Sequence, residues 1–201
     1  VVRVDGCTFE NNNALDFADG GAIFSDSSAA LSIVNCDFIS NQAETGGSIY
    51  LNSFNDNALI SGCSFTDDTS EIGGGSIAVN VDNYGLTITD SIFTRSSSRN
   101  DYGGAIFINA RNEMAVINGC AFYSTNTSGT GGAVYVSVYN HDLKIVNCSF
   151  RDTYADLRGG AIAISSLNDR LRIDECSMIW TSAYYRGGAI VMIGTNPDAV
   201  I

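Results

Sequence analysis

Proline, lysine and histidine are almost absent from this sequence. Each occurs once, as Pro197, Lys144 and His141, whereas glycine occurs 21 times. A chain with so little proline keeps nearly all the backbone N–H groups that paired strands must donate, which favours strands joined by close glycine turns. A single lysine cannot form the polybasic patch that binds anionic lipid, so that class of membrane-surface protein is excluded.

Charge is also scarce, and it is unbalanced. Only 16% of the residues are charged, with 22 acidic against 10 basic side chains and a net charge of −12. Such a surface repels phosphate backbones, which excludes nucleic-acid binding. No apolar run reaches 18 residues, so no transmembrane helix is expected. The chain opens inside a strand-like pattern without a signal peptide, and we expect it to be a segment of a longer protein.

A repeat of about 28 residues organises the whole chain. The tetrapeptide Gly-Gly-(Ala/Ser)-(Ile/Val) occurs seven times, at intervals of 26 to 29 residues. Its first glycines are Gly20, Gly46, Gly74, Gly103, Gly131, Gly159 and Gly187. A second marker, Cys-x-Phe, follows the same register at Cys7, Cys36, Cys63, Cys120 and Cys148. Two independent markers in one register indicate a repeat architecture.

Each repeat predicts three short strands. The first follows the glycine pair and the second precedes the cysteine, both with period-two apolar alternation. The third runs from the cysteine to the next glycine pair. A corner after the second strand is expected to be left-handed, because its residues tolerate positive φ: Gly6, Asn35, Gly62, Asp90, Gly119, Asn147 and Glu175.

This pattern predicts an all-β fold, a right-handed parallel β-helix of seven coils. No stretch shows a helical period of 3.6 residues, and a repeat of about 28 residues that closes on itself stacks each strand on its copy in the next coil. The right hand follows the general preference of parallel crossovers. We expect residues 1–201 to be a single segment of a longer solenoid.

One asparagine column supports the stacked arrangement. It lies three residues before the second strand and contains Asn55, Asn83, Asn112, Asn140, Asn168 and Asn196. Stacked asparagine side chains can hydrogen-bond from coil to coil, so we expect a structural ladder here.

The combination of Gly-Gly-Ala-Ile with Phe-x-x-Asn resembles the repeats of chlamydial polymorphic outer membrane proteins, within the broad pectin-lyase-like β-helix group. Phe9 to Asn12 and Phe38 to Asn41 match the second motif in full. Later copies replace the asparagine by Asp68, Ser96, Thr125, Thr153 and Thr181. The resemblance covers the whole chain and implies an extracellular or cell-surface passenger segment, often adhesive.

The six cysteines share one inward column. Neighbours in adjacent coils would have parallel Cβ vectors, which places the Cβ atoms too far apart for an unstrained disulfide. We therefore expect buried thiols that pack as small apolar groups. A linear column does not converge on one point, so no metal site and no cofactor are predicted.

The acidic residues do not form a catalytic cluster in the predicted register. Asp67 and Asp68 stand in one coil without matching pairs on either side, and His141 is expected to be a solvated loop residue. Three acids recur at equivalent loop positions two coils apart: Asp56, Glu113 and Asp169. Because polysaccharide lyases and hydrolases of this fold need clustered acids with a nearby Arg or His, we expect no enzyme activity.

Two groups of aromatic residues are candidate binding surfaces. The outward column beside the glycine pair contains Phe24, Tyr50, Phe107 and Tyr135, interrupted by alanines. An exposed stripe of this kind suits a protein interface or sugar stacking, unless the rings only brace the sheet. The second group is Tyr154, Arg158, Tyr184, Tyr185 and Arg186. Tyr and Arg are common interface anchors, with ordinary solvated turn residues as the alternative.

Asn126 and Asn147 each begin an N-glycosylation motif, and Asn126 is the better candidate because Asn147 occupies the tight corner. Together these features favour a structural or adhesive extracellular module of a surface protein or filament. Its expected partners are surface or matrix proteins, neighbouring β-helix segments or glycans. The alternative is a polysaccharide-binding or polysaccharide-cleaving β-helix.

Overall fold

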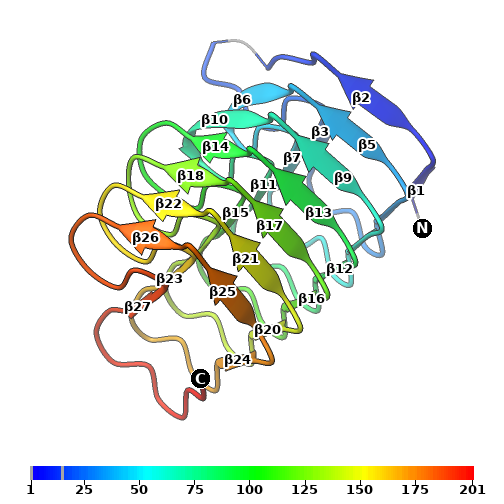
Figure 1. The fold of residues 1–201 in the computed structure, drawn as a ribbon. Helices are drawn as coiled ribbons and strands as arrows, with labels where there is room; N and C mark the ends of the chain where they lie inside the picture. The colour runs from blue at the N-terminus through cyan, green and yellow to red at the C-terminus, as the bar shows by residue number, and fades with distance from the viewer. Residues whose placement is uncertain (1, 15) are drawn as a thin grey trace.

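The computed structural model describes residues 2–14 and 16–201, and it forms a parallel β-solenoid. Figure 1 shows the chain winding in successive coils from the N-terminal end to the C-terminal end, with each strand beside its counterpart one coil later. The described residues contain strands and turns only. Among them, no helix is long and apolar enough to cross a membrane.

The strands form four parallel sheets. Sheet A contains β1 (Arg3–Asp5), β4 (Ser32–Val34), β8 (Leu59–Ser61), β12 (Thr87–Thr89), β16 (Val116–Asn118), β20 (Lys144–Val146) and β24 (Arg172–Asp174). Sheet B contains β2 (Thr8–Glu10), β5 (Asp37–Ile39), β9 (Ser64–Thr66), β13 (Ile92–Thr94), β17 (Ala121–Tyr123), β21 (Ser149–Arg151) and β25 (Ser177–Ile179). Sheet C contains β6 (Gln42–Thr45), β10 (Thr69–Gly73), β14 (Ser97–Ser98), β18 (Asn126–Thr127), β22 (Tyr154–Ala155) and β26 (Ser182–Ala183). Sheet D contains β3 (Ile23–Ser25), β7 (Ile49–Leu51), β11 (Ile77–Val79), β15 (Ile106–Ile108), β19 (Val134–Val136), β23 (Ile162–Ile164) and β27 (Ile190–Met192).

The prediction of three strands per coil is wrong, because the third strand bends and divides between sheets B and C. The bend lies at a left-handed residue with φ between 52° and 58° in every coil: Asn11, Ser40, Asp67, Arg95, Ser124, Asp152 and Trp180. Serine, arginine and tryptophan carry no sequence signal for positive φ, so this corner was not visible. The predicted corner after sheet A is confirmed, with φ between 50° and 64° from Gly6 to Glu175.

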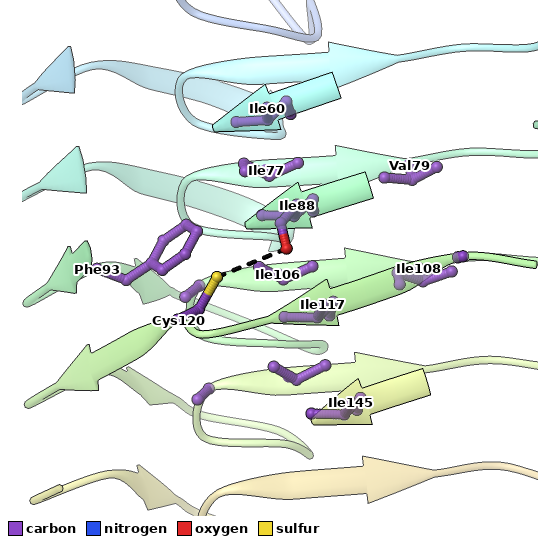
Figure 2. Packing of buried hydrophobic residues seen from close by; sticks show 14 of the residues in the cluster. Ile60, Ile77, Val79, Ile88, Phe93, Ile106, Ile108, Ile117, Cys120 and Ile145 are labelled. Atoms are coloured by element: carbon purple, nitrogen blue, oxygen red, sulfur yellow. Dashed lines mark hydrogen bonds between the residues drawn. The ribbon is translucent and has the colours of Figure 1, made fainter. Parts of the chain in front are cut away.

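The core consists of identical residue types stacked along the solenoid axis. Figure 2 shows Ile60, Ile88, Ile117 and Ile145 of sheet A facing residues of sheet D such as Ile77 and Ile106. The phenylalanines of sheet B stack from Phe9 to Phe150 with ring centroids 4.7–5.0 Å apart and planes within 8°. Burying each ring removes a large apolar surface from water, worth roughly 1.5–3 kcal/mol.

All six cysteines are free thiols. This agrees with the prediction that parallel Cβ directions in neighbouring coils disfavour disulfides. Cys36, Cys63, Cys120 and Cys148 are buried. The Cys120 thiol donates to the Ile88 carbonyl at 3.7 Å (Figure 2). Cys7 is exposed and Cys176 is half-buried, so the column is not buried along its full length.

The asparagine column forms a continuous ladder, called here the asparagine ladder. The backbone N–H groups of Asn55, Asn83, Asn112, Asn140 and Asn168 each donate to the side-chain Oδ1 of the next asparagine at 2.9–3.1 Å. The side-chain amides also donate to backbone carbonyls one coil earlier, for example Asn112 to Asn80 at 2.8 Å. These bonds pair buried polar groups that would otherwise lack partners.

A second polar column inside the solenoid continues the Phe-x-x-Asn motif, and is called here the Asn12 column: Asn12, Asn41, Asp68, Ser96, Thr125, Thr153 and Thr181. Asn12 donates to Asn41, and the Asn41 backbone N–H donates to Asp68 Oδ1 at 3.0 Å. Beyond this point Asp68 Oδ2 and the hydroxyls of Thr125 and Thr153 lack a partner. Burial raises the pKa of Asp68 to about 6.

Candidate binding face

The outward face of sheet D, with the residue columns on either side of it, is the candidate functional site and is called here the sheet D face. Its central column is Phe24, Tyr50, Ala78, Phe107, Tyr135, Ala163 and Val191, which pair in register from β3 to β27. In the first two coils the rings are accessible. Phe24 is 54% exposed and stacks on Tyr50 with centroids 5.5 Å apart.

The expectation of an exposed stripe is correct at Phe24 but wrong at Tyr135. Tyr135 is only 9% exposed, and Ala78 and Ala163 are buried. The ring of Tyr102 covers this part of the sheet, with its centroid 4.5 Å from Tyr135 and 5.6 Å from Phe107. The stripe is therefore exposed at Phe24, half-buried at Tyr50 and Phe107, and closed at Tyr135.

Tyr102 belongs to a column that immediately precedes the glycine pairs, called here the rim column. Its members are Thr45, Gly73, Tyr102, Thr130, Arg158 and Arg186, and consecutive members form parallel bridges. In every pair except the last, the second glycine lets the backbone of the next coil approach closely. A Cβ on Gly104, for example, would lie 2.2 Å from the Gly132 carbonyl oxygen. The rim column lies along one side of the sheet D face.

A row of amides lies on the other side of the same face, called here the amide row. Asn109 Nδ2 donates to Asn80 Oδ1 at 2.9 Å, and Asn80 Nδ2 donates to Asn52 Oδ1 at 2.9 Å. Asn52 in turn donates to the Asp26 carboxylate at 3.1 Å. This row was not among the predicted site residues, although its spacings of 28 and 29 residues follow the repeat.

A hollow of ≈ 140 Å³ opens between the aromatic rings and the amide row. Tyr50 and Phe107 flank it, and Ala78, Asn80 and Asn109 also line it. Because an alanine interrupts the aromatic column here, the two flanking rings lie two coils apart, about 9.6 Å between their backbones. Burial raises the pKa of Tyr50 to about 12, so its phenol stays protonated as a hydrogen-bond donor.

The second predicted patch is partly joined to the same face. Tyr154, Tyr184, Tyr185 and Arg186 are exposed and Arg158 is half-buried. Tyr184 and Tyr185 meet edge to face with centroids 5.3 Å apart. The two arginines are rim-column members that line a hollow of ≈ 210 Å³ above β27. The structure therefore brings these arginines to the C-terminal end of the sheet D face.

The acidic candidates occupy separate environments. Asp67 forms a two-point ion pair with Arg95 at 2.7 Å, which holds the Asp67 pKa below its usual range. Asp68 is enclosed in the solenoid interior. The described residues include no group of three or more His, Cys, Asp or Glu side chains that could hold a metal ion.

His141 is only partly the solvated loop residue that the sequence predicted, because its side chain is 38% exposed but one ring nitrogen is enclosed. Its Nδ1 atom is buried without a hydrogen bond and lies 4.0 Å from Asp169 Oδ2. Arg170 contacts Asp169 and also forms a two-point ion pair with Asp142. The stacking of two turns brings the pair His141 and Asp142 beside the pair Asp169 and Arg170, although the pairs are 28 residues apart in the sequence.

Both candidate glycosylation asparagines have exposed side chains. Asn126 lies in β18 and its Oδ1 accepts a hydrogen bond from Ser97 at 2.9 Å. Asn147 occupies the corner with a φ of 53°, and its Nδ2 donates to Asn118 at 3.0 Å. The Nδ2 atom of Asn147, to which a glycan would be attached, is thus already hydrogen-bonded. Asn126 remains the better candidate for glycosylation.

Comparison with known proteins agrees with this architecture. The family described as right-handed beta helix region matches residues 21–197. The chain belongs to this family, and its solenoid is a right-handed parallel β-helix. Neither the curated proteins nor the solved structures gave a match.

Proposed function

We propose that this chain is a non-catalytic structural or adhesive module of an extracellular or cell-surface protein, and that it binds its partners through the sheet D face. Candidate partners are surface or matrix proteins, neighbouring β-helix segments and glycans. The observation that carries the proposal is the accessible pair Phe24 and Tyr50. It lies on the same face as a hollow and a row of side-chain amides.

The sheet D face combines features that are common in binding surfaces. Stacked rings offer apolar area with few rotatable bonds, and aromatic residues contribute strongly to interface energy. The amides beside them can hydrogen-bond to a partner and fix its orientation. Because intercoil hydrogen bonds hold every strand of sheet D, this surface is rigid before the partner arrives, which lowers the entropic cost of binding.

Binding of the purified chain to panels of matrix proteins and glycans tests this proposal. The double variant Phe24→Ser/Tyr50→Ser removes the accessible rings and should weaken binding about tenfold or more. Tyr123→Ser is the matched control, because Tyr123 is an exposed tyrosine on sheet B. Equal binding by the double variant and the unmodified chain would contradict the proposal.

Polysaccharide cleavage is the second candidate function, and the cluster of His141, Asp142, Asp169 and Arg170 is the observation that favours it. An imidazole beside carboxylates and an arginine can supply acid–base chemistry. Incubation with acidic polysaccharides, followed by assay for reducing ends and unsaturated products, tests this candidate. Turnover that disappears in His141→Ala would establish cleavage and overturn the non-catalytic proposal.

A further inference from the structure

We propose that Arg158 and Arg186 form a two-arginine site for an oxyanion, a carboxylate or sulfate group carried by the ligand of the sheet D face. This inference rests on the proposed binding function of that face and adds the chemistry of one end of it.

The first observation is that these two arginines lack acidic partners in a chain rich in acid. Acidic side chains outnumber basic ones by 22 to 10. Within residues 2–14 and 16–201, every basic side chain forms an ion pair except Lys144, Arg158 and Arg186. Two of these three unpaired cations occupy neighbouring positions in one column.

The second observation is the spacing of the two arginines. Their backbones form a parallel bridge, so their Cα atoms lie one coil apart, about 4.8 Å. Side chains that leave neighbouring coils on the same side can direct both positive charges into one hollow, where an anion between them offsets their mutual repulsion. An oxyanion with several acceptor oxygens can receive hydrogen bonds from both guanidinium groups, each of which presents a planar fork of donors.

The third observation is the hollow that the two side chains line. It measures ≈ 210 Å³, and its remaining lining is Val191, Met192, Ile193 and Gly194. The two arginines are thus the only charged residues that line it, so no acidic side chain of the lining competes with a bound anion. The hollow is large enough for a small oxyanion together with the group that carries it.

The charge distribution also directs an anion to this end of the solenoid. Residues 1–100 contain 13 acidic and 3 basic side chains, whereas residues 101–201 contain 9 acidic and 7 basic side chains. The N-terminal half therefore repels an anionic group much more strongly than the C-terminal half. In the same rim column, the earlier coils carry the uncharged Thr45, Gly73, Tyr102 and Thr130.

The test is a titration of the complete chain, labelled with ¹⁵N-arginine, at low ionic strength. Sodium sulfate and sodium acetate are added in separate arms, and the Nε–Hε signals of the arginines are followed by NMR. Saturable shifts are expected at Arg158 and Arg186, and the two arms show whether sulfate or carboxylate binds better. Either Arg158→Gln or Arg186→Gln should weaken binding about tenfold, the loss expected when one charge-assisted partner is removed.

Two further variants keep the result interpretable. Lys144→Gln removes an unpaired cation from sheet A and should leave the titration unchanged. Arg158→Lys keeps the charge but loses the planar fork, so it should bind more weakly than the unmodified chain and more strongly than Arg158→Gln. The inference is overturned if neither anion gives saturable shifts, if the double Gln variant still binds, or if Lys144→Gln weakens binding equally.

This test is separate from that of the proposed function. Phe24→Ser/Tyr50→Ser lies several coils away and should leave anion binding intact. If the chain binds sulfate or acetate but binds no protein or glycan of the panels, the two-arginine site is supported and the adhesive function is contradicted. The reverse outcome would retain the adhesive function and remove the site.

Discussion

The asparagine ladder and the Asn12 column both carry buried polar side chains from coil to coil, yet only the ladder keeps one residue type along its length. In the ladder, each Oδ1 accepts the backbone N–H of the preceding asparagine. In the Asn12 column this bonding ends at Asp68, and the hydroxyls of Thr125 and Thr153 have no partner. The ladder therefore supplies backbone hydrogen bonds in every coil that it spans, whereas the Asn12 column does so only as far as Asp68.

The ladder lies in a turn where the backbone cannot pair as a strand. Asn55 stands between Phe54 and Asn57, which have φ values of 52° and 56°. The asparagine side chain supplies the acceptor for a buried N–H group that would otherwise lack one. The comparison indicates that a polar column is preserved where it completes backbone hydrogen bonds and can change where it only fills space.

Breaking the ladder in its middle should have the largest effect on stability. Asn112 Oδ1 accepts from both the backbone N–H and the side-chain amide of Asn83, each at 3.1 Å. Asn112→Ala leaves the buried backbone N–H of Asn83 unpaired and removes the amide that donates to the Asn80 and Ala110 carbonyls. We therefore expect a loss of about 4 kcal/mol in the free energy of unfolding. Urea denaturation measures this, and a loss below about 1 kcal/mol would remove the distinction between ladder and column.

Replacing Asp68 should reveal the weakest point of the Asn12 column. Burial raises its folded-state pKa to about 6, above an unfolded value of about 3.9. Its favourable contribution is therefore complete below about pH 4 and is lost as pH rises through about 6. Asp68→Asn should stabilise the chain by roughly 2–3 kcal/mol at pH 8 and by little at pH 4.

Unfolding measured from pH 4 to pH 8 checks this expectation. Stability curves that run parallel for Asp68→Asn and the unmodified chain would show that the buried carboxyl is not the source of the pH dependence. No charged side chain contributes to the shift of Asp68; its neighbours are Asn41, Ser48 and Ser76.

Removing a hydroxyl from the Asn12 column should cost nothing. Thr125 Oγ1 is buried without a partner, so Thr125→Val removes a desolvated polar atom and preserves the shape. We expect a gain of up to about 1 kcal/mol by thermal or urea unfolding. Marked destabilisation would mean that this hydroxyl holds a hydrogen bond and that the column resembles the ladder more closely.

The smallest effect is expected at Asp67, the exposed neighbour of Asp68. Arg95 lowers the pKa of Asp67, so the ion pair stabilises the chain above the unfolded pKa and its contribution is lost as pH falls through the lowered value. Because the pair is solvent-exposed, Asp67→Asn should cost well under 1 kcal/mol near neutral pH. If Asp67→Asn destabilised the chain by as much as Asp68→Asn stabilises it, the ion pair would not be weakened by solvent as expected.

Inward-facing features could be predicted from the sequence, and outward-facing ones largely could not. The isoleucine, phenylalanine and cysteine columns repeat because burial restricts each position in every coil. The sequence did not indicate that Tyr102 covers Tyr135, because this contact depends on a side chain lying over a neighbouring coil. The bend at Ser40, Arg95 and Trp180 was also hidden, since those residue types do not signal positive φ.

The candidate site shows the same division. The sequence indicated four binding candidates that the structure places on one face: Phe24, Tyr50, Arg158 and Arg186. That they share this face could be recognised only from the pairing register of the strands. The contact between His141 and Asp169 likewise depends on the stacking of two turns. Most outward positions vary from coil to coil, and apart from the amide row no periodic pattern indicates which of them lie together.

The direction of the intercoil hydrogen bonds gives the solenoid a particular response to mechanical force. All strand pairing joins one coil to the next, parallel to the axis. Tension applied to the two ends of the chain pulls on all these contacts in series, and the coils at the ends, which pair on one side only, should unwind first, so that the structure lengthens stepwise instead of rupturing as a whole. A coil of 28 residues releases roughly 90–100 Å of extended chain. A surface attached through such a segment could absorb repeated pulls by lengthening, with the remaining coils still folded.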